Sequence, residues 1–297
     1  MSTRDWTARA TWEGLNITQT TALWMAYVAT GRLGAHCTKV GASFFYYPSL
    51  QAQIRGAIAL QDIEKGERLC EVPVQSLFSE YAVGNSTLAP VIAALRTSLL
   101  SSPGENGKHE GATWRLRRRA THIDTRAILA LFALRELERV RSPWMPYLQV
   151  VAMHDVSGVP MVWPETSPRW EKVGQMLHDL GARARKDAVR QYEALVEPAI
   201  EWFGASLSDG LSCGGSCPLQ RLKVIYSMER FLRFYAIIAA RDWVLPLNGE
   251  PKAFLAPILD MLNFGQVLHS WSDTMHHPNH LPPCTPAFVH CMCMTRF

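Results

Sequence analysis

Several features that define common classes of protein are missing from this chain. No stretch of about 18 apolar residues occurs, so the sequence predicts no membrane-spanning helix. There is no Walker loop, dinucleotide-binding glycine fingerprint or nucleophile elbow, which argues against the usual nucleotide-binding and hydrolase sites. The net charge is only +4, with 30 Lys and Arg against 26 Asp and Glu. A nucleic-acid binder should carry a concentrated basic face, so we expect no nucleic-acid partner.

The sequence also lacks a signal for export. The N-terminus contains no cleavable apolar core, and the 7 Cys are scattered. We therefore expect reduced thiols in an intracellular protein, with no feature that separates cytoplasm, nucleus and chloroplast. The one basic cluster, at residues 115–119, follows a Ser/Pro/Gly-rich stretch and is expected to be a solvated loop; contact with an acidic partner is the alternative.

Two cysteine clusters raise the question of a metal site. Cys213-x-x-x-Cys217 lies in a Gly-rich stretch, and His290-Cys291-x-Cys293 lies close to the end of the chain. Zinc requires about four well-spaced ligands, and these two clusters are far apart with spacings unlike those of a zinc ribbon or finger. We expect no metal site.

What is present is the composition of a globular protein, since 48% of the residues are hydrophobic. Apolar spacing predicts a short helix over residues 20–28, ended by two glycines. Residues 57–60 and 68–72 have the character of short strands, and the polar segment 62–67 separates them. We expect these two strands to form a β-hairpin.

Residues from about 85 to 242 have the periodicity of helices. Three long patterns cover residues 126–140, 170–203 and 219–243, and Pro198 predicts a kink or break in the second. The third pattern carries a wide apolar stripe that includes Tyr235, and Tyr226 lies on the same expected helix; we interpret both tyrosines as core residues.

The pattern over residues 126–140 is amphipathic. Asp124 or Thr125 is its expected N-cap. The charges near its end are expected to lie mostly on the side away from the apolar stripe: Arg135, Glu136, Glu138 and Arg139.

Residues 266–297 differ from the rest of the chain. They hold five of the ten His, three of the seven Cys and four Pro, with one acidic residue and no helical or strand periodicity. We interpret this segment as an irregular tail that could be non-native, as if an unspliced or frame-shifted gene had been translated.

Four motifs, in this order, carry a resemblance to a known family. A Gly-x-x-Ala strand begins at Gly56, and a Trp-x-Pro-Tyr segment begins at Trp144. A helical pattern ends in Ala240-Arg241, and Pro-x-x-Asp-x-x-Asn runs from Pro257 to Asn263. Over roughly residues 20–264 the chain resembles the SET-domain protein methyltransferases of the branch typified by the Rubisco large-subunit lysine methyltransferase.

The resemblance implies a site for S-adenosyl-L-methionine, which that family grips largely through backbone. The cofactor's carboxylate and amino group need a cation and backbone partners, its adenine needs a flat apolar wall, and an Asn side chain offers donor and acceptor together. Phe264 stands where the family usually has His. The implied cofactor-binding residues are Gln53, Ile54, Arg55, Arg241, Asp260, Met261, Leu262, Asn263 and Phe264.

The implied reaction is transfer of a methyl group to a neutral lysine amine of a non-histone protein; some relatives methylate histidine. The family uses a C-terminal tyrosine hydroxyl, but Tyr235 is the last tyrosine here, so we assign no catalytic residue. We expect an incomplete enzyme that acts as a monomer.

The implied fold is α+β: a SET β core with a large helical insert, without the C-terminal part of the core and the helical substrate-binding domain. We divide the chain at these boundaries: an N-terminal flank over 1–50, the first part of the SET core over 51–84, the helical insert over 85–240, a partial C-terminal SET motif over 241–265, and the irregular tail over 266–297.

Each motif has a simpler explanation when taken alone. Gly56 could be a strand glycine or a bulge, and Arg241 could be a cation that the helix dipole favours. Asp260 and Asn263 could cap a following turn. The alternative function is therefore a non-catalytic SET relic that serves as a protein-interaction module.

Overall fold

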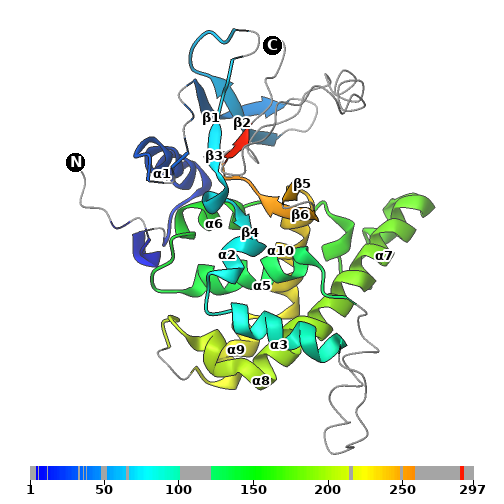
Figure 1. Cartoon of the computed structure of the whole chain (residues 1–297). Coiled ribbons are helices and arrows are strands. Elements are labelled where there is room, and N and C mark those ends of the chain that lie inside the picture. Colours follow the sequence, from blue (N-terminus) through cyan, green and yellow to red (C-terminus); the bar gives the residue numbers. More distant parts are fainter. Residues whose placement is uncertain are drawn as a thin grey trace, which may run out of the picture.

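The computed structural model describes residues 5, 7–11, 13–32, 34–35, 37, 39–47, 52–64, 67–100, 122–213, 217–247, 250–257 and 288–290. Their fold is mixed α+β, mostly helical, with small antiparallel sheets. Figure 1 shows β1, β2 and β3 at one end of the molecule and a body of helices below them. The basic segment 115–119 and residues 266–287 of the expected tail lie outside the described residues.

Helix α5 (Thr125–Glu138) lies at the centre of the helical body. The expected N-cap is confirmed, because the Asp124 carboxylate accepts a hydrogen bond of 3.1 Å from the backbone N–H of Arg126. Eleven of the 14 residues of α5 are buried. It packs against α10 (Met228–Ala239), α6 (Met145–Ala152) and α2 (Glu80–Gly84), so it is covered on more than one side.

The expected solvent face of α5 is therefore wrong. Arg135 is 0% exposed and Glu136 1%, and they form an ion pair of 2.7 Å with each other. Glu138 is also buried, and it pairs with Arg230 of α10. A buried charge is tolerated only when it is paired and hydrogen-bonded, and these pairs meet that condition.

The other helices follow the predicted regions with changed boundaries. Helix α1 (Ile17–Ala29) is confirmed, and Gly31 after it has a φ of 67°. The second long pattern forms α7 (Gln175–Gln191), the π-helical segment η5 (Tyr192–Val196) and α8 (Glu197–Ser208), so the regular α-helix is interrupted by a π-helical segment before Pro198, where a kink or a break was expected, and the non-helical backbone angles inside α8 are at Phe203. The remaining helical elements are η1 (Arg9–Thr11), η2 (Val74–Ser76), α3 (Ala89–Leu100), η3 (Pro160–Val162) and η4 (Trp170–Lys172).

The third long pattern is two helices rather than one. Helix α9 (Leu219–Ile225) ends at Tyr226, and α10 begins at Met228. Ser227 has extended backbone and accepts a hydrogen bond from the backbone N–H of Arg230, as an N-cap residue does. Apolar periodicity continues across this break, which is why the sequence pattern did not reveal it.

The expected hairpin between residues 57–60 and 68–72 is also wrong. Strand β2 (Ala52–Ala59) pairs antiparallel with β1 (Val40–Tyr47), from Val40 opposite Ala59 to Tyr47 opposite Ala52. Strand β3 (Glu71–Pro73) pairs instead with β7 (Phe288–His290), which lies in the segment expected to have no strand. In the sequence, β1 lies closer to β2 than β3 does, and its aromatic run marked it as a possible strand partner.

A three-stranded antiparallel sheet follows the end of α10. Its order is β4 (Phe78–Ser79), β6 (Glu250–Leu255), β5 (Trp243–Leu247). Pro246 and Pro251 lie opposite each other in the β5–β6 hairpin. Strand β4 precedes helices α2 to α10 in the sequence, and β5 and β6 follow them. The sheet therefore brings together the two segments that flank the helical region.

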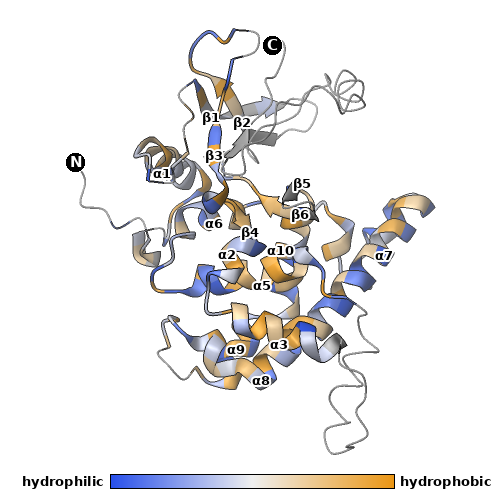
Figure 2. Ribbon diagram, in the orientation of Figure 1, coloured by the Kyte–Doolittle hydropathy of each residue, from blue (hydrophilic) through white to orange (hydrophobic). Residues whose placement is uncertain are grey.

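The core is rich in aromatic rings that contact one another, some stacked and others edge-on or tilted. Phe78 lies 5.0 Å from Phe132 and 5.3 Å from Trp144 between ring centroids, and Tyr147 lies 5.8 Å from Trp24. The Trp-x-Pro-Tyr segment thus begins α6 and packs two of its rings into the core. Figure 2 shows hydrophobic residues gathered on the central helices and β6, whereas α7 carries hydrophilic stretches.

Four cysteines form disulfides, so the expectation of reduced thiols is wrong for them. Cys37 pairs with Cys70 and Cys213 with Cys217. In the chain-entropy estimate, the sequence separation of 33 gives the first bond about 4 kcal/mol of stabilisation, and the separation of 4 gives the second about 2 kcal/mol.

Among the described helices, none has the length and apolar character needed to cross a membrane.

The stacked pair of Phe78 and Phe132 predicts an effect on stability. Phe132 is 1% exposed, so Phe132→Ala should lower the free energy of unfolding by about 3–5 kcal/mol through lost burial and a cavity. Tyr81→Ala is the matched control, because Tyr81 is 56% exposed and its loss should change stability by about 0.5 kcal/mol or less. Urea unfolding followed by circular dichroism measures both. Equal effects of the two substitutions would contradict this description of the core.

Candidate functional site

Arg241, the helix-end arginine, lies in the turn between α10 and β5. The backbone N–H of Ala240 still bonds to Ala236 inside the helix, and that of Arg241 donates to the Ile238 carbonyl at 2.9 Å. Strand β5 begins two residues later. The expected placement of Arg241 at a helix end is therefore confirmed, and the side chain is half-buried there.

The Arg241 guanidinium contacts the imidazole of His154, which follows α6. Its Nη2 lies 3.1 Å from His154 Nδ1 and also approaches Nε2. Guanidinium nitrogens can only donate, so a hydrogen bond here requires an imidazole nitrogen without a proton, and the tautomer of His154 decides which of its two nitrogens that is. Sequence reasoning did not identify His154, since it lies 87 residues from Arg241 and belongs to no motif.

Arg233, an arginine of α10, fixes the backbone that carries His154. Arg233 Nη2 donates to the carbonyl oxygens of Ala152 and His154, both at 2.8 Å. These are hydrogen bonds from a charged donor, which are stronger than neutral ones. The exit of α6 is thereby tied to α10, and the imidazole is held beside Arg241.

The residue after Arg241 is fixed by a long-range ion pair. Arg126 Nε lies 2.8 Å from Asp242 Oδ2, and the Asp242 side chain is 6% exposed. Arg126 belongs to the first turn of α5, so this pair fixes the turn after α10 to the start of the central helix. The ion pair thus positions the backbone next to Arg241.

Tyr235 completes this cluster. Its hydroxyl donates to Asp124 Oδ2 at 2.6 Å, while the other Asp124 oxygen caps α5. Burial raises the pKa of Tyr235, and the hydrogen bond to Asp124 raises it further. The core placement predicted for this tyrosine is confirmed.

Tyr226 is also a core residue, as predicted. Burial raises the pKa of its phenol, and its hydroxyl donates to the Leu207 carbonyl at 3.2 Å. Tyr226 and Tyr235 are thus both engaged in internal hydrogen bonds, and neither presents a free hydroxyl to a substrate.

The first part of the expected cofactor site lies on β2. Gln53, Ile54 and Arg55 stand opposite Tyr46, Phe45 and Phe44 of β1. In the described structure β1 is the sheet neighbour of β2, so along the other edge of β2 the backbone groups are not used by that ladder. Such an edge suits a ligand that is gripped through backbone.

The parts of the expected site are not assembled from the described residues alone. The extensive packing of β2 is against β1, whereas Arg241 contacts His154. The last part, Asp260, Met261, Leu262, Asn263 and Phe264, lies outside the described residues. Strand β6 ends at Leu255, directly before the Pro257 that begins this motif.

The donors present fit the polar end of S-adenosyl-L-methionine. Arg241 offers a half-buried cation of the kind that a carboxylate takes, and the edge of β2 that faces away from β1 carries backbone carbonyls and N–H groups of the kind that an amino group and a carboxylate take. Within the described residues, no group of three or more His, Cys, Asp and Glu could hold a metal ion.

Comparison with known proteins adds no assignment. A scan against models of protein families finds no match to this sequence, and a search of curated proteins finds none.

The buried tyrosines predict a loss of stability at high pH. Because the folded-state pKa of Tyr235 is raised, the unfolded chain releases the phenol proton first, and stability falls as pH rises above about 10. The contribution of one such tyrosine falls by about 1.4 kcal/mol per pH unit until its folded-state pKa is reached.

Tyr235→Phe should therefore make the free energy of unfolding less sensitive to pH between about pH 10 and 12. Urea unfolding at several pH values measures the slope for both proteins. Tyr81→Phe is the control for loss of a tyrosine hydroxyl from the surface, since Tyr81 is 56% exposed. An unchanged slope in Tyr235→Phe would contradict the buried position of its phenol.

Proposed function

We propose that this chain is a SET-type, S-adenosyl-L-methionine-dependent protein-lysine N-methyltransferase that acts on a non-histone protein. The observation that carries the proposal is the order of the elements. The Gly-x-x-Ala strand is β2, a helical region follows, Arg241 stands in the α10–β5 turn, and β6 leads to Pro257. Histidine is the alternative methyl acceptor.

The residues of this chain have separate parts in the proposed site. Arg241 binds the cofactor carboxylate, the β2 edge binds through backbone at Gln53–Arg55, and Asn263 contributes donor and acceptor from the following motif. His154 orients the Arg241 guanidinium, and the Arg126–Asp242 pair fixes the turn beneath it. The cofactor, when bound, supplies the electrophilic methyl group.

The protein's contribution to the reaction is alignment and exclusion of water. A lysine amine attacks only in its neutral form, and a desolvated channel lowers its pKa and favours that form. Placing the amine in line with the methyl group removes much of the entropic barrier. We assign no catalytic residue, because Tyr226 and Tyr235 are engaged inside the core.

A non-catalytic interaction module remains the second candidate, and one feature favours it. Helix α7 extends away from the body in Figure 1, and its first half exposes large apolar side chains. Met176 is 77% exposed, with Leu177 and Leu180 next to it on the same helix. Exposed apolar groups of this kind are typical of protein-binding surfaces.

Cofactor binding provides the first test of the methyltransferase proposal. S-adenosyl-L-methionine at about 100 times its dissociation constant should stabilise the protein by about 2.7 kcal/mol, which raises Tm by about 4 °C. Arg241→Ala should lose most of this shift, because the carboxylate loses its cationic partner. Differential scanning fluorimetry measures both.

Arg190→Ala is the matched control for that test. Arg190 is 50% exposed and pairs with Asp187 on the surface of α7, so its loss should leave the cofactor-induced shift unchanged. An absent shift in the wild-type protein, or an equal shift in Arg241→Ala, would contradict the proposed site.

Methyl transfer separates the two candidate functions. With the radiolabelled methyl donor and a cell lysate, the enzyme should label a protein, and acid hydrolysis should release methyl-lysine. A methyl-histidine product would move the proposal to the alternative acceptor. Cofactor binding without any labelled protein would favour the interaction module.

A further inference from the structure

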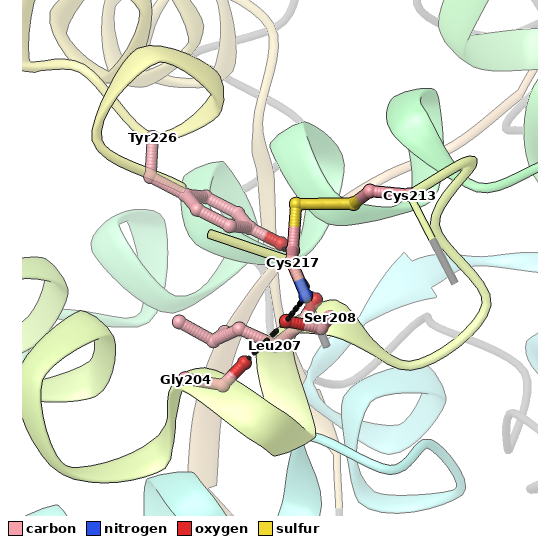
Figure 3. Close-up of a disulfide and its surroundings, with 6 residues drawn as sticks. All are labelled: Gly204, Leu207, Ser208, Cys213, Cys217 and Tyr226. Atoms are coloured by element: carbon pink, nitrogen blue, oxygen red, sulfur yellow. Dashed lines mark hydrogen bonds between the residues drawn. A yellow bond between two sulfur atoms is a disulfide. The ribbon is translucent and has the colours of Figure 1, made fainter. Parts of the chain in front are cut away.

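The disulfide Cys213–Cys217 occupies the connection between α8 and α9. The two Cα atoms are 5.3 Å apart, and both side chains are half-buried against the core. Figure 3 shows the bond beside the last turn of α8, with Ser208 and Tyr226 close to it. No role in the proposed methyl transfer uses this bond.

The downstream flank of this bond is held by contacts that do not need it. The backbone N–H of Cys217 donates to Ser208 Oγ at 3.3 Å, and Ser208 Oγ donates to the Gly204 carbonyl at 2.6 Å. The Tyr226 hydroxyl donates to the carbonyl of Leu207 (Figure 3). The chain that carries Cys217 is therefore fastened to the last turn of α8.

The upstream flank is fastened to the central helix. The backbone N–H of Val140 donates to the Gly210 carbonyl at 3.0 Å, and Arg139 and Leu211 form an antiparallel bridge. Arg135 also donates to the Asp209 carbonyl at 3.2 Å. Both flanks are thus fixed without the disulfide, so its two sulfurs should remain close together after reduction.

The second disulfide differs in the length of chain that it closes and in the burial of one of its cysteines. Cys37–Cys70 joins residues 33 apart, and Cys70 is 1% exposed. A long cross-link constrains the unfolded chain more than a short one, and by linkage the fold protects the long cross-link more strongly. A buried sulfur is also poorly accessible to an attacking thiolate.

We propose that Cys213–Cys217 is a reversible redox site that opens and closes in the folded protein, while Cys37–Cys70 is structural. Its reaction partner is a thiol of the glutathione or thioredoxin class. A thiolate of the reductant attacks one cysteine sulfur, forms a mixed disulfide with it and releases the other cysteine as a thiolate; a second thiol of the reductant then attacks the reductant's own sulfur in the mixed disulfide and releases the remaining cysteine as a thiolate. The net change is two electrons and two protons to the cysteine pair, with the reductant oxidised to its disulfide.

Opening the bond should loosen the α8–α9 connection and leave the central helix unchanged. Without the bond, Cys213 and Cys217 are no longer joined covalently, and the start of α9 is held to α8 through the hydrogen bond between Cys217 and Ser208, while Tyr226 holds its far end. Helix α5 keeps its own contacts to residues 209–211. The site therefore controls a local opening rather than global folding.

Peptide mapping after redox titration tests the proposal. The full-length oxidised protein is equilibrated in glutathione buffers of increasing reduced-to-oxidised ratio, acid-quenched, alkylated and digested. We expect Cys213 and Cys217 to be alkylated at a ratio on the order of tenfold less reducing than Cys37 and Cys70 require. Oxidised glutathione should then restore the bond.

Hydrogen exchange with paired variants completes the test. Reduction should speed amide exchange in residues 217–226 several-fold and leave residues 125–138 unchanged. Cys213→Ser/Cys217→Ser should show the fast exchange with or without reductant, and Cys37→Ser/Cys70→Ser should keep the wild-type response. If the latter variant does not fold, the wild-type titration decides alone.

Three results would overturn the proposal. Both disulfides could open at the same glutathione ratio, Cys213 and Cys217 could be alkylated already in the oxidised protein, or reduction of that pair could unfold the chain. Each would show that the bond is absent, or is not a separately addressable redox site.

Discussion

The burial of α5 on several sides is the constraint on which the rest of the structure depends. A helix with eleven buried residues out of 14 can be stable only if other elements cover it, and α2, α6 and α10 do so. Covering it also takes Arg135 and Glu136 out of water, where unpaired charges would cost several kcal/mol each. Their partners, from Thr87 and Ser142 to Asp209, therefore bring together segments that are distant in sequence.

The sequence could predict those parts of the fold that depend on local pattern. Capping and apolar spacing located α1, α5 and the end of α10, because helix hydrogen bonds and side-chain contacts join residues a few positions apart. The same pattern could not tell a surface helix from a covered one, so it placed the charges of α5 in solvent. It also could not choose a strand partner, because pairing of β2 with β1 rather than β3 depends on register and tertiary contact.

In the candidate site, too, the local features could be predicted from the sequence and the long-range contacts could not. Arg241 was found from its position at a helix end, and the buried state of Tyr226 and Tyr235 from their place on an expected helix of the insert. The contacts that give Arg241 its surroundings join residues 79 to 116 positions apart, through His154, Arg233 and the Arg126–Asp242 pair. No motif or periodicity marks such contacts, since they arise only when α5, α6 and α10 are packed together.

The two proposed sites lie at opposite ends of α5. Its first turn holds the turn after Arg241 through Arg126 and Asp242, and its last turn holds residues 209–211 before the disulfide. A helix of 14 residues separates these ends by about 20 Å. Energetic coupling over that distance requires an element with two discrete arrangements, and a tightly covered helix whose charges are paired has one. Opening the disulfide should therefore leave Arg241 and His154 in place, so the redox site and the cofactor site are independent of each other.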